Sequence, residues 1–355
     1  MNWLLLFIPL AIGLEHWAPQ QHLAIFLASG LAILPLAAWM GRATEHLAER
    51  MGDGVGGFLN ATFGNAAELI IAVAAMRSGL YDVVKASIAG SIVGNMLLVL
   101  GAAMMAGGLI HREQTYNPQG ARIQATMLTL AAITLVLPAA YRAALGEEAA
   151  PGLVPLSVSI SIVLLLVYGL FLAFSLGSHS ALFKGTQAVV EEGHAAPWSV
   201  SRAALVLAAS TAAIAWMSEL LVGSIQPAAK ALGLGSTFVA VFVVAILGNA
   251  AEHATAVTVA MKNRMDLALS IAIGSSVQVA LFVAPVLVLL SLAIGPHPMD
   301  LAFPSGLVLI VLLSVLITGQ VAADGRSDWL RGVQLLAVYV VLGLTFFFIP
   351  AALAP

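Results

Sequence analysis

Two glutamates lie inside apolar stretches of the chain, and each comes three residues after the asparagine of a Gly-Asn pair. Glu68 belongs to the motif GNAAELI at 64–70, and Glu252 belongs to the near-copy GNAAEHA at 248–254. A carboxylate deep in an apolar span is costly, so it needs a proton or a positive partner. Carboxylate oxygens are also preferred ligands of hard cations such as Ca²⁺. The two motifs therefore predict a site that binds cations and protons at Glu68 and Glu252.

The asparagines of the two motifs add neutral oxygen ligands. Asn65 precedes Glu68 by three residues, and Asn249 precedes Glu252 by three, so each pair shares one helix face. Glycine and asparagine both weaken a helix, and we expect each helix to open at the Gly-Asn pair and turn backbone carbonyl groups inward. We therefore expect these four side chains to be the metal ligands. Such an all-oxygen set suits Ca²⁺ better than zinc or copper.

Polar residues on the segments after each motif predict a second layer around the site. The stretches 87–101 and 270–282 combine small residues with hydroxyl and amide side chains. The residues expected to support the cation site are Ser91, Asn95, Ser275 and Gln278. Glycine and serine at such positions are also common in plain helix packing. The two segments are not equivalent, because Gly94 aligns with Gln278.

Three further polar residues are candidates for an access path or a gate. His253 directly follows Glu252 and points roughly 100° away on a helix, which favours a contact between helices over cation binding. Glu45 and Glu219 lie toward the ends of the helices that precede the motif helices. Glu45 fits a solvated charge at the membrane interface. Glu219 is surrounded by apolar residues in the sequence, which fits a place along an access path.

The composition indicates that membrane helices position these residues. Of the 355 residues, 61% are hydrophobic and 9% are charged, and the mean hydropathy is +1.02. Soluble domains carry about 25% charged residues. The chain has no cysteine, which excludes disulfides, thiolate metal sites and cysteine nucleophiles. The N-terminal stretch lacks a basic segment and a cleavage site, so we expect a retained helix rather than a signal peptide.

Apolar runs long enough to cross a bilayer predict an all-α polytopic membrane protein with about 11 transmembrane helices. The expected spans are 3–17, 22–44, 56–77, 83–110, 121–141, 152–176, 200–230, 236–261, 266–294, 301–320 and 331–353. Ten Lys and Arg residues fall on the side that holds the N-terminus and four on the other side. Basic residues gather on the cytoplasmic side, so we expect a cytoplasmic N-terminus and a C-terminus on the opposite side. In a bacterium this would be the plasma (inner) membrane.

The two halves of the chain are related. A shift of 184 residues lays 64–95 on 248–279 with 11 identities in 32 positions, which predicts an internal repeat. The two motif helices lie five spans apart and so cross the membrane in opposite directions, as in the inverted repeats of secondary transporters. The expected divisions are an extra N-terminal helix, a first five-helix repeat, a cytoplasmic linker and a second five-helix repeat, at 1–21, 22–176, 177–199 and 200–355.

The motifs resemble those of a known family. LNATFGNAAELIIA and ILGNAAEHATAV, followed by GSIVGNMLLVLG and GSSVQVALFVAP, resemble the paired repeats of the cation/proton exchangers of the CAX family, in the Ca²⁺:cation antiporter superfamily. The resemblance implies alternating access, with Glu68 and Glu252 binding cation or protons in turn. It also implies that the helices of Glu45 and Glu219 slide during switching. One departure is the linker, which holds only Glu191 and Glu192 where the family has a strongly acidic helix.

The functional expectation is a secondary active antiporter that exchanges Ca²⁺ for H⁺. Alternatives are a Na⁺/Ca²⁺ exchanger and a cation/proton antiporter of broader specificity for Mn²⁺ or Na⁺. A passive cation channel and an intramembrane enzyme are rivals of other classes, and the second would need clustered His/Asp or a Ser/His pair at membrane depth. We expect no catalytic residues and no cofactor, with Ca²⁺ as transported substrate. The expected partners are Ca²⁺, H⁺ and the lipid bilayer, without nucleic acid, and the sequence is compatible with a homo-oligomer.

Overall fold

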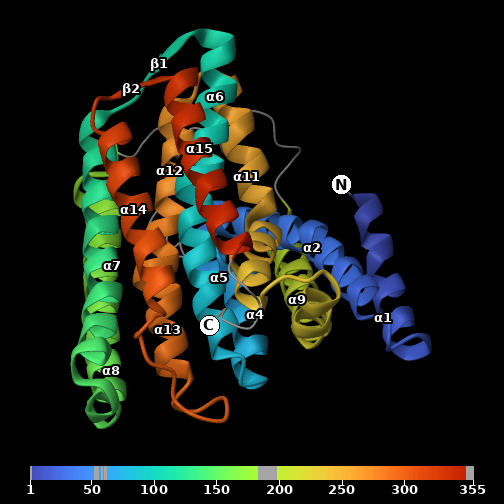
Figure 1. Ribbon diagram of the computed structural model, residues 1–355. Coiled ribbons are helices and arrows are strands. Elements are labelled where there is room, and N and C mark those ends of the chain that lie inside the picture. Colours follow the sequence, from blue (N-terminus) through green and yellow to red (C-terminus); the bar gives the residue numbers. More distant parts are fainter. Residues whose placement is uncertain (1, 52–55, 57–58, 60–61, 183–197, 349–355) are drawn as a thin grey trace. The chain divides into compact units, whose positions relative to one another are not determined.

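The computed structural model describes residues 2–51, 56, 59, 62–182 and 198–348, and these residues are almost entirely helical (Figure 1). The helices are α1 (Phe7–Trp17), α2 (His22–Met51), α4 (Ala66–Arg77), α5 (Tyr81–Val93), α6 (Leu100–His111), α7 (Pro118–Leu145), α8 (Ala150–Leu172), α9 (Val200–Ala231), α10 (Ser236–Phe238), α11 (Ala245–Met261), α12 (Met265–Gln278), α13 (Ala284–Leu290), α14 (Ser305–Ala322) and α15 (Trp329–Phe347). Two short strands, β1 (Glu113–Thr115) and β2 (Arg326–Asp328), complete the described structure.

The helices confirm the all-α membrane class. Eight helical stretches among the described residues are long and apolar enough to cross a bilayer. One of them, Pro118–Ser178, contains both α7 and α8. These two helices are separated at Gly146, whose φ of 57° ends α7. The expected count of 11 spans therefore stays a prediction, although each expected span contains or overlaps a described helix.

The chain forms two compact units, and each combines segments from both predicted halves. The first unit comprises Met1–Ser87, His194–Ala251 and Phe346–Pro355, and the second comprises Ile88–Gly193 and Glu252–Thr345. The repeat boundaries expected from the sequence are not tested by this division and remain predictions. Most of the expected linker, 183–197, lies outside the described residues.

In the first unit, the long helices α2 and α9 pack along one another. Gly30 of α2 leaves room for side chains of two neighbouring helices, because a Cβ atom at this position would lie 2.7 Å from Leu247 Cδ1 on α11 and 3.6 Å from Leu221 Cδ1 on α9. The apolar side of α2 is buried at Ile33 and Met40. Helix α4, which carries the first motif glutamate, also packs on α9.

In the second unit, α12 packs against α6, α7 and the π-helical segment Gly94–Val99. Helices α7 and α14 lie side by side (Figure 1). Strands β1 and β2 pair antiparallel, with Gln114 opposite Ser327. Gln114 Nε2 also donates to the Ala260 carbonyl oxygen at 2.8 Å, which caps the last turn of α11. The strand pair thus ties the end of the second motif helix to the α14–α15 connection.

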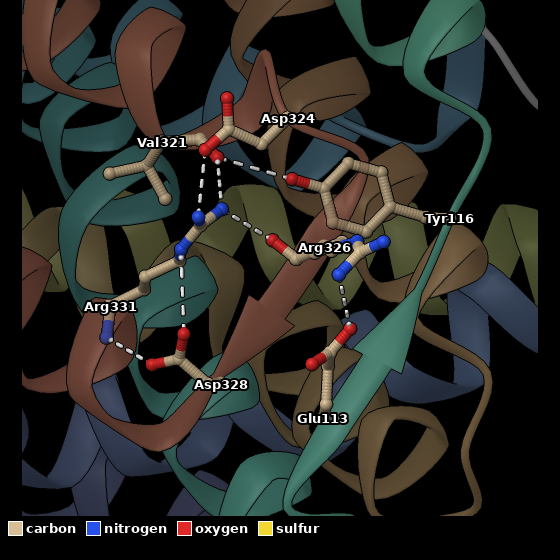
Figure 2. Close-up of polar contacts among 7 residues, drawn as sticks. All are labelled: Glu113, Tyr116, Val321, Asp324, Arg326, Asp328 and Arg331. Atoms are coloured by element: carbon tan, nitrogen blue, oxygen red, sulfur yellow. Dashed lines mark hydrogen bonds and ion pairs between the residues drawn. The ribbon is translucent and has the colours of Figure 1, made fainter.

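An ion-pair network surrounds the strand pair (Figure 2). Arg331 donates to Asp324 at 2.7 Å and to the Arg326 carbonyl oxygen at 2.7 Å, and its Nε lies 3.5 Å from Asp328. The Tyr116 hydroxyl donates to the Val321 carbonyl oxygen at 3.2 Å. Burial raises the pKa of Tyr116 to about 12, although the positive charge of Arg331 acts in the opposite direction.

The backbone supports the internal repeat at two places. Gly79 and Asn263, which are related by the shift of 184, both have positive φ, of 74° and 61°. The turns around them have the same hydrogen bonds, from Gly79 N to Met76 O and from Asn263 N to Ala260 O. The second place is a pair of π-helical segments, 94–99 and 279–283, at nearly equivalent positions. Such π-turns often mark functional sites in helices.

Candidate functional site

The first motif lies at a break between helical segments. Gly64 and Asn65 form a turn, and α4 starts at Ala66. Asn65 has φ −102° and ψ 24°, outside the helical range, and is buried. Glu68 falls in the first turn of α4. The helix therefore opens at this Gly-Asn pair, as expected from the sequence.

The second motif does not open, and this expectation was wrong. Helix α11 runs without interruption from Ala245 to Met261, through Gly248 and Asn249. The buried Asn249 side chain donates from Nδ2 to the Ala245 carbonyl oxygen at 3.0 Å, one turn earlier, which is compatible with a regular helix. The irregular segment instead precedes the motif, as a π-helical stretch at Val239–Val244.

Glu68 brings the first motif against the second within the first unit. A Cβ atom on Gly248 would lie 3.2 Å from Glu68 Cγ and 3.6 Å from the carboxyl carbon Cδ. Because Gly248 has no side chain, the end of the Glu68 side chain can pack directly against its backbone. The glycine of one GNAAE copy thus lies next to the glutamate of the other copy within the first unit.

Glu252 is held by a polar network in the second unit. Its carboxyl group is hydrogen-bonded to Ser275. Asn95 Nδ2 donates to Ser275 Oγ at 3.1 Å, and Asn95 Oδ1 lies 3.1 Å from His253 Nε2. The structure therefore joins Glu252 with three other residues that the sequence singled out, Ser275, Asn95 and His253.

The remaining support residues lie near this network. Ser91 is buried on α5, and Gln278 is half-buried one turn after Ser275 on α12. Ser276 donates to the Ile92 carbonyl oxygen at 3.3 Å. Positions 92 and 276 are related by the shift of 184, so α5 and α12 cross at the same point of the repeat.

The sequence missed the partnership of Asn95 with His253. In the repeat, Asn95 aligns with Val279 and His253 aligns with Leu69. A comparison of the two halves therefore does not indicate that Asn95 and His253 interact. The available signal was chemical: a histidine that points away from the glutamate face needs a polar partner on another helix. The bond between His253 and Asn95 is a contact between helical segments, and the expected part of His253 in access or gating stays a prediction.

The two outer glutamates, Glu45 and Glu219, belong to the first unit. Glu219 on α9 is exposed and forms a 3.3 Å ion pair with Arg77, at the end of α4. Glu45 is half-buried on α2. Their expected part in access or gating stays a prediction.

The fold and the paired motifs define a class, that of polytopic helical transporters with a duplicated acidic motif. The family model described as sodium/calcium exchanger protein matches residues 21–177 and 202–348, and the chain belongs to this family. The two matched segments leave out the expected first helix and the linker.

Two named antiporters are similar to this chain over nearly its whole length. A Ca(2+)/H(+) antiporter of Aphanothece halophytica is 48% identical, over 98% of this chain and 96% of its own length. The Ca(2+)/H(+) antiporter ChaA of Bacillus subtilis (strain 168) is 40% identical, over 96% of both chains. These similarities confirm the resemblance to the cation/proton exchangers that the motifs indicated.

Solved structures support the same fold. The structure titled native YfkE superposes with a TM-score of 0.81 at 38% identity, over 96% of this chain and 97% of its own. The H+/Ca2+ exchanger CAX superposes with a TM-score of 0.70 at 14% identity, over 99% of this chain and 90% of its own. The second likeness, at this low identity, concerns the fold alone.

Proposed function

We propose that this transporter exchanges Ca²⁺ for H⁺ by alternating access, with Glu68 and Glu252 binding the cation or protons in turn. The observation that carries the proposal is the environment of the two motif glutamates. Glu68 lies against the glycine of the other motif, and Glu252 lies in a network of neutral polar side chains. Two relatives are Ca(2+)/H(+) antiporters by name, which supports the same pair of ions.

The coupling follows from the cost of charge in an apolar surrounding. A carboxylate without a proton or a cation is expensive in the membrane interior, so an empty and ionised site is the least favourable state. Two protons or one divalent cation balance two carboxylates equally well. A transporter that changes its access side only when the charge is balanced exchanges the two ions instead of leaking either one.

The asparagines complete the proposed ligand set. Asn65 and Asn249 are both buried at the third position before a glutamate. Their amide oxygens, with nearby carbonyl oxygens, would give Ca²⁺ the oxygen ligands that it prefers. Ser91 and Gln278 would support this set by holding water or a ligand oxygen. In this proposal the N-terminus is cytoplasmic and the protein lies in the plasma (inner) membrane of a bacterial cell.

Proteoliposomes with an imposed pH gradient test the proposal. Ca²⁺ uptake should follow the proton gradient, collapse with a protonophore and disappear in Glu68→Gln and in Glu252→Gln. Normal uptake by either variant would refute the assignment of that residue. Competition by Mn²⁺ and Na⁺ in the same assay measures the breadth of the cation specificity.

A second arm replaces the pH gradient with a Na⁺ gradient. The description of the family names sodium as well as calcium, which favours Na⁺/Ca²⁺ exchange as the second candidate. Ca²⁺ uptake driven by Na⁺ at constant pH would select that candidate over proton exchange. Downhill flux of Ca²⁺ without a driving ion would instead indicate a channel.

A further inference from the structure

Four side chains form a continuous hydrogen-bond chain that ends at Glu252. His253 Nε2 lies 3.1 Å from Asn95 Oδ1, and Asn95 Nδ2 lies 3.1 Å from Ser275 Oγ. Ser275 is hydrogen-bonded in turn to the Glu252 carboxyl group. The series of hydrogen bonds thus starts at His253 on α11 and passes through Asn95 and Ser275 on two other helical segments. It ends at Glu252, the residue before His253 on α11. All four residues belong to one compact unit.

The hydrogens in this chain have one consistent arrangement. The amide nitrogen of Asn95 can only donate and its amide oxygen can only accept. The Ser275 hydroxyl oxygen therefore accepts from Asn95, and when Glu252 is ionised the hydroxyl hydrogen donates to its carboxylate, which can only accept. Because Asn95 Oδ1 carries no hydrogen, His253 Nε2 must donate to it. All three hydrogen bonds thus donate in the direction of Glu252.

The two oxygens of Glu252 have different surroundings. Oε2 is buried and has no hydrogen-bond partner among the described residues. The bond to Ser275 is therefore made by the other carboxyl oxygen. A buried acceptor without a partner is unfavourable, and this cost is removed when a cation or a proton arrives.

We propose that His253, Asn95 and Ser275 are positioning residues, which fix one oxygen of Glu252 and thereby present Oε2 to the transported cation. His253 acts through Asn95, and Asn95 acts through Ser275. This inference rests on the proposed function, in which Glu252 binds the cation. It adds a specific role for two residues, Asn95 and His253, that have no polar counterpart in the repeat.

The control for this proposal is the neighbouring serine. Ser276 is buried on the same helix, and its hydroxyl donates only to backbone carbonyl oxygens, of Ile92 at 3.3 Å and Ala272 at 3.1 Å. Ser275→Ala and Ser276→Ala each remove one buried hydroxyl from α12. A general effect of a lost hydroxyl on helix packing should appear in both variants, whereas an effect on the carboxyl group of Glu252 should appear in only one.

The test measures the KM for Ca²⁺ and the kcat of proton-driven uptake in proteoliposomes. We expect Ser275→Ala to raise the KM about tenfold, as the loss of one hydrogen bond to a charged group predicts. Asn95→Ala and His253→Ala should raise the KM by no more than Ser275→Ala does, because they act on Glu252 only through Ser275. The kcat should stay within about a factor of two of the unmodified protein, since the variants weaken orientation and keep the carboxylate. Ser276→Ala should leave the KM unchanged.

Double variants test whether the residues act as a chain. If His253 and Asn95 act only through Ser275, then adding either substitution to Ser275→Ala should raise the KM no further. Multiplied effects in the double variants, or an unchanged KM in Ser275→Ala, would overturn the proposal. Glu252→Gln separates this failure from failure of the proposed function: if that variant transports Ca²⁺ normally, Glu252 is not the cation-binding residue, whatever the serine variants do.

Discussion

The Glu68 side chain lies against the bare backbone of Gly248, with its Cγ atom 3.2 Å from the place of a Cβ atom. The two residues come from different copies of the same motif. A larger residue at 248 would crowd the Glu68 side chain, whereas the backbone of α11 is regular there and would accept any residue with good helix propensity. The close approach explains why a helix-weakening residue stands in the middle of an uninterrupted helix.

Gly248→Ala should impair transport without unfolding the protein. The added methyl group would press on Glu68 Cγ, and the flexible glutamate side chain would move away by a few tenths of an ångström. We expect the KM for Ca²⁺ to rise several-fold, because ligand geometry at a carboxylate site tolerates little displacement. Gly223→Ala on α9 is the matched control, since a Cβ atom there meets nothing within 4 Å. Equal KM values for the two variants would argue against a functional position for Glu68.

The sequence singled out individual polar residues but not how they pair. Ser275, Asn95 and His253 were each named from the sequence, and in the structure they are linked by hydrogen bonds to Glu252 and to one another. The contact of Asn95 with His253 was not predictable, because it depends on which faces of two helices meet. The strand pair also escaped prediction, since three-residue strands between helix ends carry no periodic pattern.

The second Gly-Asn pair shows another limit. Both copies have the same residues, yet the helix opens at Gly64-Asn65 and stays closed at Gly248-Asn249. Helix weakening is a local tendency of a few kcal/mol at most, and tertiary packing overrides it. The motif therefore indicates where a helix is able to open, and the surrounding helices decide whether it does.

Arg331→Lys should lower the stability of the protein by about 1–2 kcal/mol, because lysine cannot replace the several directed hydrogen bonds of a guanidinium group. Arg331 donates to Asp324 and to the Arg326 carbonyl oxygen, and its side chain is 25% exposed. The control is Arg326→Lys, in an ion pair with Glu113 whose side chains are 68% and 56% exposed. This exposed pair should contribute less than about 0.5 kcal/mol. Thermal unfolding in detergent at constant pH compares the two, and equal losses would contradict the prediction.

Tyr116 should make the protein less stable at alkaline pH. Its pKa is raised from 10.0 to about 12 by burial, so the folded protein holds the phenol proton more tightly than the unfolded chain does. The stabilising contribution is present in full below about pH 10 and is lost as the pH rises toward about 12. Tyr116→Phe should lack this alkaline loss of stability, because phenylalanine does not titrate. The substitution also removes the hydrogen bond to the Val321 carbonyl oxygen, which lowers the stability at every pH. The measurement is the fall in Tm between pH 9 and pH 11 (about one unit on either side of the ordinary value) in both proteins. An equal fall in the two proteins would show that folding does not raise the pKa of Tyr116.

Gly332 allows α15 to lie directly on the backbone of α6. A Cβ atom at Gly332 would overlap Met105 N and lie 2.6 Å from the Gly101 carbonyl oxygen. Small residues give membrane helices such close contact, and backbone atoms cannot move aside as a side chain can. Gly332→Ala should therefore separate the two helices and lower the stability by about 1–3 kcal/mol or more. Gly319→Ala on α14, where a Cβ atom meets nothing within 4 Å, should be neutral or stabilising, because alanine favours the helix. Thermal unfolding in detergent ranks the two variants, and a Gly332→Ala protein as stable as Gly319→Ala would mean that α6 and α15 do not pack on these glycines.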